Sequence, residues 1–78
     1  MKYNPLYIES AIKAAVNTSS SDRHLYVYAT INGYVVTDKI PPFSQNYIET
    51  AGLVITEHVY NFQTFAYQEY TRTLNNYK

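Results

Sequence analysis

The chain has 78 residues with six basic and six acidic side chains, so its formal net charge at pH 7 is zero. This balance argues against a basic patch for phosphate backbones and against the acidic surface of a nucleic-acid mimic. The sequence contains no cysteine, which rules out disulfides, and two histidines are too few for a structural zinc site.

The first predicted element is a helix over about residues 5–17. Asn4 is a favoured N-cap residue, and Pro5 suits the first helical position because its missing N–H has no partner there. Apolar residues then recur at helical spacing, and they are Ile8, Ala11, Ile12, Ala15 and Val16. The polar run 17–22 ends this helix in a loop.

A β-hairpin is predicted next, because Asn32-Gly33 is the preferred centre of a tight two-residue turn. The flanking strands would cover 24–31 and 34–40, with Ala29 opposite Val36 and Tyr28 opposite Thr37. One face would form core, with Leu25, Val27, Ala29, Ile31, Tyr34, Val36 and Ile40. The other face would be aromatic and polar, with His24, Tyr26, Tyr28, Thr30, Val35, Thr37 and Lys39.

The last third of the chain is predicted to form one long helix. Pro41-Pro42 ends the second strand, and Asn46 with Glu49 resembles a capping box. One helical side would carry Ile48, Ala51, Ile55, Val59, Phe62, Ala66 and Tyr70. A second ridge repeats every seven residues, at Leu53, Tyr60, Tyr67 and Leu74.

Two other interpretations of this last segment stay open. A helix of roughly 30 residues would reach about 45 Å and overhang so small a domain, unless it packs on another chain or breaks near Gly52. Alternatively, the short β-branched run 53–56 forms a third strand.

The predicted fold class is therefore α+β, with a helix, a β-hairpin and a long helix in one small domain over 1–78. Its two-stranded antiparallel sheet would pack on the helices and be completed by oligomerisation. A chain this short is only marginally stable. With disulfides and a structural zinc site excluded, association with a partner subunit is the remaining way to stabilise it. We expect a homodimer through the second ridge, Leu53, Tyr60, Tyr67 and Leu74, or through the open edges of the hairpin.

A candidate binding surface lies on the aromatic face of the hairpin. Tyr26 and Tyr28 could stack on a flat ligand or a partner protein, while Arg23 and Lys39 lie near a phosphate. The competing interpretation is that this face packs on the second helix of the same chain or of a twin. The hydroxyls of 18–21 could also bind an anion, although such runs are usually solvated turns.

Catalysis is not predicted. The acidic residues are scattered, and no nucleophile stands beside a base in the sequence. His58 is expected to be an interior or interface histidine with satisfied hydrogen bonds, and not to form a pair of metal ligands with Glu57. His24 is expected to be a surface residue. We expect no catalytic residue, cofactor or metal site.

Ten tyrosines in 78 residues are the strongest indication of function. Tyrosine combines a large apolar ring with one polar tip and suits surfaces that meet another molecule. We expect a non-enzymatic interaction protein, in the style of a phage or mobile-element inhibitor that blocks a host protein. The alternatives are an oligomeric sponge for a nucleotide-like ligand and a structural subunit. Without a signal-peptide or membrane-spanning pattern, the expected location is the cytoplasm.

Overall fold

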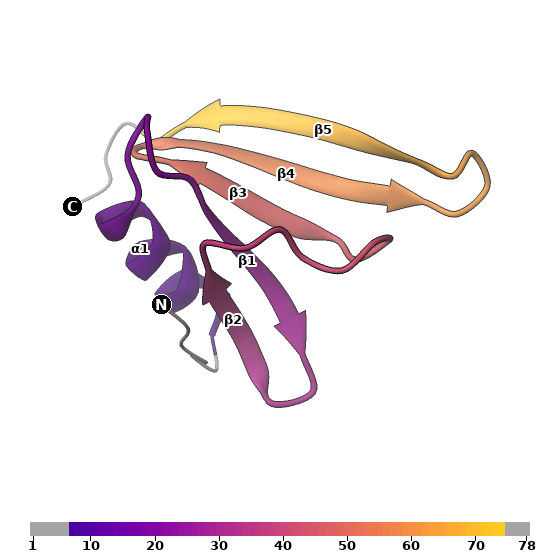
Figure 1. The fold of residues 1–78 in the computed structure, drawn as a ribbon, viewed down its shortest axis with the longest axis horizontal. Helices are drawn as coiled ribbons and strands as arrows, with labels where there is room; N and C mark the ends of the chain where they lie inside the picture. The colour runs from indigo at the N-terminus through magenta and orange to yellow at the C-terminus, as the bar shows by residue number, and fades with distance from the viewer. Residues whose placement is uncertain (1–6, 75–78) are drawn as a thin grey trace.

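The computed structural model describes residues 7–74, which form one helix and a five-stranded antiparallel sheet (Figure 1). The strands lie in the spatial order β2-β1-β3-β4-β5. The elements are α1 (Ile8–Thr18), β1 (Leu25–Thr30), β2 (Gly33–Thr37), β3 (Tyr47–Ala51), β4 (Val54–Asn61) and β5 (Ala66–Thr73).

The predicted order of helix, hairpin and long helix is wrong, because residues 47–73 form three strands. This segment is rich in β-branched and aromatic residues, whose side chains fit a pleated surface. Their stiff χ1 angles also disfavour a helix. The longest dimension of the molecule is 37 Å, shorter than the helix that the seven-residue repeat predicted. The alternative of a strand over 53–56 comes closer, since β4 contains most of that run.

Gly52 is the residue that turns β3 back onto β4. The two central residues of this hairpin are Gly52 and Leu53, between the paired Ala51 and Val54. Gly52 has a φ of +62°. A glycine at the first central position is what a type II′ turn requires, and this turn matches the twist of the flanking strands.

The first helix is confirmed, with bounds of Ile8–Thr18 in place of 5–17. The expected cap at Asn4 and Pro5 lies outside the described residues. Three residues of the apolar stripe, Ala11, Ala15 and Val16, are buried against the sheet. Small side chains there let the helix approach the strands closely, which sets α1 over β1, β2 and β3.

The first hairpin is confirmed, but its turn lies one residue earlier than predicted. Ile31 and Asn32 occupy the turn, and Gly33, at φ 112°, pairs with Thr30. Ala29 therefore lies opposite Tyr34 and not Val36. This shift of two in the pairing keeps every side chain on its predicted face. Ile31 and Ile40, however, are exposed rather than part of the core.

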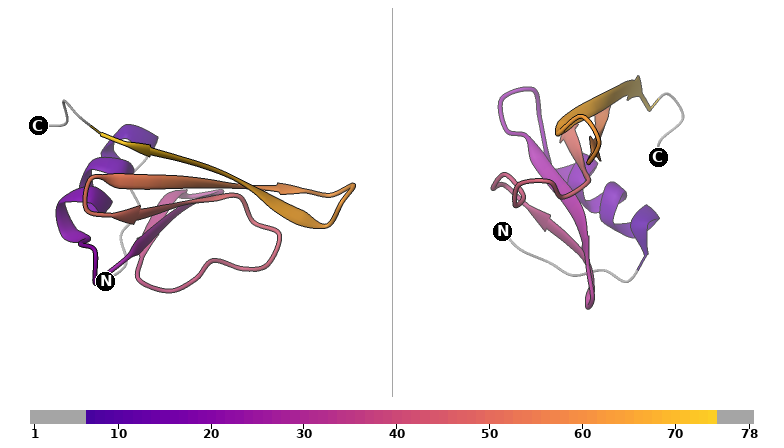
Figure 2. Two further views of the ribbon diagram at one scale, coloured as in Figure 1. Left: turned by 90° about the horizontal axis from the view of Figure 1, so that it is seen from above. Right: turned by 90° about the vertical axis from the view of Figure 1, so that its right-hand side faces the viewer.

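The core lies between α1 and one face of the sheet. Its buried members on the strands are Leu25, Val27, Val36, Ile48 and Ile55. The connection from β2 to β3, residues 38–46, lies on the opposite side of the sheet from α1 (Figure 2, right). The β4–β5 hairpin reaches beyond both layers at one end of the molecule (Figure 1).

Candidate functional site

Four polar side chains contact one another in a row across the sheet face opposite α1, and we call them the polar network. The Nδ1 atom of His24, just before β1, lies 2.6 Å from Oε2 of Glu49 on β3. Oε1 of Glu49 lies 2.9 Å from Nε2 of His58 on β4, and Nδ1 of His58 lies 3.1 Å from Glu69 on β5. A neutral imidazole has a single N–H, so His58 can donate to both carboxylates only when its ring is protonated.

The pKa shifts in the polar network follow from its hydrogen bonds. Burial by itself raises the pKa of Glu49, but hydrogen bonds from His24 and His58 outweigh it and lower that pKa below its ordinary value. The hydrogen bond to Glu49 raises the pKa of His24, against a smaller opposing effect of burial. Each charged group thus has its partner within the polar network. The arrangement joins the start of β1 to β3, β4 and β5.

An aromatic cluster surrounds these polar groups. The ring of Tyr47 stacks on His58, with centroids 4.4 Å apart and planes 12° from parallel. Tyr26 and Tyr67 meet Tyr47 edge-on at 5.9 Å and 5.7 Å, and Tyr60 meets Tyr67 at 5.0 Å. Burial, assisted by the charge of Glu49, raises the pKa of both Tyr26 and Tyr47. Their hydroxyl groups therefore remain protonated at neutral pH.

The 38–46 connection covers one end of this cluster. Phe43 packs edge-on against Tyr60 at 5.3 Å, and Asn46 accepts a 2.7 Å hydrogen bond from the Tyr60 backbone N–H. The Tyr67 hydroxyl donates to the backbone oxygen of Gln45 at 3.3 Å. Tyr60 is consequently only 6% exposed. Much of the aromatic surface is thus occupied by the chain itself.

The least covered part of the molecule is the α1 side of the β4–β5 hairpin, which we call the open hairpin face. Within residues 7–74, α1 packs on β1, β2 and β3 but not on β4 or β5. Val59 is 38% and Tyr70 is 56% exposed there, although both are large apolar residues. The polar residues around them are Glu57, Gln68 and Arg72.

The hairpin tip adds two exposed aromatic residues, Phe62 at 68% and Phe65 at 75% exposure. Asn61 holds the turn by accepting the backbone N–H groups of Gln63 and Thr64 at 2.8 and 3.3 Å. Phe65 has a φ of 54°, which is costly for a bulky residue. The position at the end of the hairpin turn accounts for this φ, but Phe65 is exposed, so packing does not explain why the residue there is phenylalanine.

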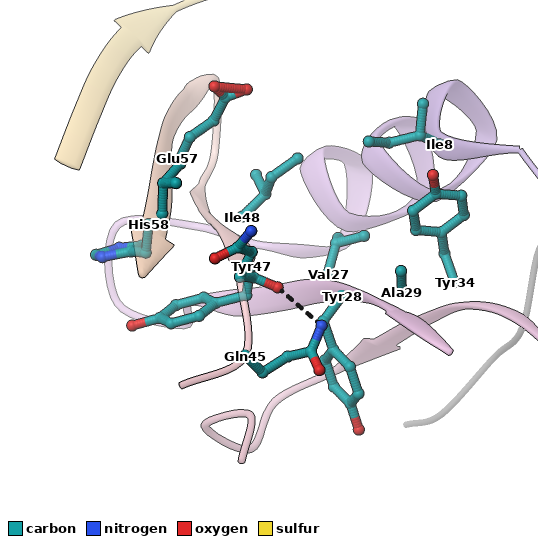
Figure 3. Close-up of a pocket in the computed structure, with 12 residues that line it drawn as sticks. Ile8, Val27, Tyr28, Ala29, Tyr34, Gln45, Tyr47, Ile48, Glu57 and His58 are labelled. Carbon is teal, nitrogen blue, oxygen red and sulfur yellow. Dashed lines mark hydrogen bonds between the residues drawn. The ribbon is translucent and has the colours of Figure 1, made fainter. Parts of the chain in front are cut away.

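A cavity of about 300 Å³ lies next to the open hairpin face (Figure 3). Val27, Ala29 and Ile48 line it from the sheet, while Ile8 and Tyr34 close the side near α1. The other lining residues are Tyr28, Gln45, Asn46, Tyr47, Glu57, His58 and Val59. This volume is at the lower end for small-molecule sites. Its lining combines apolar side chains with polar ones, and Glu57 is the acidic residue among them.

The residues predicted to bind a ligand are only partly brought together. Tyr26 and Tyr28 lie on the predicted face, opposite α1, where Tyr26 packs on Tyr47. Arg23 and Lys39 are exposed in the segments that flank β1 and β2. Of these four predicted residues, only Tyr28 lines the cavity. The carboxylate of Glu57 there would repel a phosphate, so the cavity does not favour a nucleotide-like ligand.

The second ridge does not form one surface in the structure. Tyr60 and Tyr67 pair directly across the β4–β5 hairpin, on the face opposite α1. Leu53 and Leu74 meet at the other end of the same hairpin, where Leu74 donates its backbone N–H to Leu53 at 2.8 Å. Leu74 packs against the core, and Leu53 is 48% exposed. The seven-residue repeat reflects two cross-strand pairs and not a helical stripe.

The serine-rich run 18–21 and the two histidines also find partners within the chain. Ser20 accepts the backbone N–H groups of Asp22 and Arg23, and Ser19 accepts that of Gly52 at 3.0 Å. His58 is 7% exposed and satisfied by carboxylates, as predicted for an interior histidine. Glu57, its neighbour in sequence, lies on the opposite face.

Several residues of these sites were not singled out from the sequence. The sequence pattern places Glu49 in a helix cap and Tyr70 on the apolar side of a helix, and it assigns no role to Tyr47 and Phe65. The alternation of Tyr47, Ile48, Glu49 and Thr50 would have indicated a strand with one polar face. No sequence pattern predicts the exposure of Phe65, because that exposure depends on how far the β4–β5 hairpin reaches beyond the rest of the molecule.

Within residues 7–74, no group of three or more His, Asp or Glu side chains is arranged to hold a metal ion. The described helix is neither long nor apolar enough to cross a membrane. Comparisons with protein-family models, with curated proteins and with solved structures found no match.

Proposed function

We propose that this protein is a non-enzymatic binding module that engages another protein through the open hairpin face and the hairpin tip. The observation that carries the proposal is the exposure of Val59, Phe62, Phe65 and Tyr70 on one projecting hairpin. Exposed apolar and aromatic residues that gather on one projecting element are typical of protein-interaction sites. An inhibitor that acts by occupying a host protein needs no more than such a surface.

The strained backbone of Phe65 supports the same proposal. A glycine or asparagine would adopt a φ of 54° more easily than phenylalanine. The phenylalanine at this position is thus better explained by a role of its exposed ring than by the needs of the turn. Recognition of a partner is a sufficient reason, because aromatic side chains are enriched among the residues that dominate binding energy.

The cavity supplies a place for an anchoring side chain of the partner. It is concave, about 300 Å³ in volume, and shares Glu57 and Val59 with the open hairpin face. A side chain with an apolar stem and a cationic end, such as lysine or arginine, suits a cavity whose lining combines apolar residues with the acidic Glu57. Binding energy is usually concentrated in a few pockets of this kind.

A paired capture experiment tests the proposal. Tagged wild-type protein and a Val59→Ser/Phe65→Ser variant would be incubated with the same cell lysate, and the retained proteins quantified by mass spectrometry. We expect at least one protein to be retained by the wild type and lost, by tenfold or more, with the variant.

The matched control is Ile31→Ser/Ile40→Ser, which removes two exposed apolar side chains outside the hairpin, each at least as exposed as the residue it is compared with. This control should retain the same partner as the wild type. If all three proteins retain identical sets, or if the control loses the partner and the hairpin variant keeps it, the proposed surface is wrong. Circular dichroism would verify that all variants are folded.

A further inference from the structure

Strand β5 forms an edge of the sheet, and its outward backbone groups can be identified from the pairing. Leu74 donates its N–H to the carbonyl of Leu53, so this position is hydrogen-bonded to the β4 side. Hydrogen bonding alternates along an antiparallel strand. The backbone groups of alternate β5 residues therefore face β4, and these are Ala66, Gln68, Tyr70 and Arg72. Those of Tyr67, Glu69, Thr71 and Thr73 face away from the sheet.

This edge carries two charged residues, Glu69 and Arg72, but lacks the other features that usually prevent edge-to-edge association. β5 has eight residues, contains no proline, glycine or lysine, and is exposed over nearly its whole length. Native sheets normally protect such edges with prolines, lysines, bulges or a covering segment. The opposite edge, β2, has only five residues, and its last three are buried. Of the two edge strands, β5 is the longer and more exposed, and it is therefore the one more accessible for pairing with another strand.

The side chains of β5 favour pairing with a second copy of β5. When two antiparallel strands are related by a two-fold axis normal to the sheet, the axis passes midway between one residue and its own copy on the partner strand. An axis at Tyr70 places Gln68 opposite Arg72 of the partner subunit and Glu69 opposite Thr71 of the partner subunit. Both pairs can form hydrogen bonds between side chains.

Neighbouring registers are less favourable. An axis at Glu69 places two like charges directly opposite each other. An axis at Thr71 leaves Tyr67 without an opposite residue on β5 of the partner. With the axis at Tyr70, all four outward-facing residues exchange backbone hydrogen bonds across the interface, about eight in total.

We propose that the protein forms a homodimer in which β5 pairs antiparallel with β5 of a second copy, centred on Tyr70. The two sheets become continuous, and both α1 helices lie on the same side. The open hairpin faces of the two subunits then adjoin and form the floor of one groove between the helices. The dimer does not depend on the proposed partner binding, but it would double the surface that a partner meets.

Cysteine cross-linking tests this register, because the native chain has no cysteine. At the axis, the two Tyr70 positions form a non-hydrogen-bonded pair with Cα atoms about 4.5 Å apart, within disulfide range. We expect Tyr70→Cys to form a covalent dimer on mild oxidation. The matched control is Gln68→Cys, whose two copies would lie roughly 13 Å apart and should remain uncross-linked.

Sedimentation of the wild-type protein over a range of concentrations gives the second measurement. We expect a reversible monomer–dimer equilibrium. Thr71→Glu, which opposes Glu69 of the partner subunit twice by symmetry, should weaken association about tenfold relative to Thr71→Lys. A wild type that stays monomeric, or cross-linking of Gln68→Cys in preference to Tyr70→Cys, would overturn the proposal. Neither result bears on the capture experiment, whose variants leave β5 unchanged.

Discussion

Glu49 illustrates how the chemistry of single residues depends on the sheet. Its two carboxylate oxygens hold different histidines, His24 before β1 and His58 on β4. The three residues are far apart in sequence, and only the pairing of β1, β3 and β4 brings them to one face. The result is a set of charge-assisted contacts that connect the strands on the side where α1 is absent.

The pH dependence of stability tests this network. The pKa of Glu49 is lowered on folding, so its contribution is complete above 4.5 and is lost as the pH falls through the folded value. The pKa of His24 is raised, so its contribution is complete below 6.5 and is lost as the pH rises through the folded value. The network should therefore stabilise the fold most between pH 4.5 and 6.5.

The measurement is urea unfolding of the wild type and of Glu49→Gln across this pH range. We expect the variant to lose about 1 kcal/mol near pH 5.5, because His58 is buried while solvent screens the contact with His24. The difference should shrink at both higher and lower pH. Asp38→Asn, at an exposed position, is the control, and a pH-independent difference for Glu49→Gln would contradict the assignment.

At the level of elements, the β4–β5 hairpin combines a buried end with an exposed end. Near Leu53 and Leu74 it joins the core through Ile55 and Leu74. Toward the tip it loses the cover of α1, and its turn holds Phe65 at a positive φ. Stability and exposure are thus separated along a single hairpin, which leaves the tip free to serve recognition.

The strain at the tip can be measured by substitution. Phe65→Gly should raise the free energy of unfolding by about 0.5–1 kcal/mol, because glycine adopts this φ without a steric cost. In a domain of this size, the melting temperature would rise by roughly 2–8 °C. Phe62→Gly is the comparison, and it should lower stability because Phe62 packs on Tyr60 at 4.8 Å. A melting temperature for Phe65→Gly at or below that of the wild type would show that the backbone is not strained.

On the scale of the whole molecule, a small core has to stabilise a wide sheet. Among residues 7–74 a single helix covers it, and the fully buried side chains include Leu25, Val27, Val36 and Ile55. A domain this small has a stability of roughly 4–12 kcal/mol, so each core residue carries a large share of it. Dimerisation through β5 would add stability that the single chain lacks.

Two leucines test where this core lies. Leu25→Ala should cost about 2–5 kcal/mol, because Leu25 is fully buried beneath α1. Leu53→Ala should cost under about 1 kcal/mol, because Leu53 is 48% exposed at the β3–β4 turn. Thermal unfolding of both variants gives the comparison. Equal losses would mean that the core extends to the turn.

The sequence by itself determined the elements whose signals are local. The first helix follows from apolar spacing, and the first hairpin from Asn32-Gly33 between alternating strands. Even with the turn displaced, Leu25, Val27 and Val36 kept their core face, because a shift of two residues preserves the alternation. For these parts, side-chain periodicity decides which face of the strand a residue occupies, although Ile31 and Ile40 stay exposed and Val35 is buried on the other face.

Only the tertiary structure decided the rest. Asn46 and Glu49 suit a helix cap by spacing, yet Asn46 binds the Tyr60 backbone and Glu49 binds His24 and His58. Tyr60 and Tyr67 match a helical repeat and a cross-strand pair equally well. The physical reason is that strand pairing joins residues far apart in sequence, so its energy is absent from any local pattern. The same non-local pairing leaves β5 at an edge and Val59 and Tyr70 uncovered.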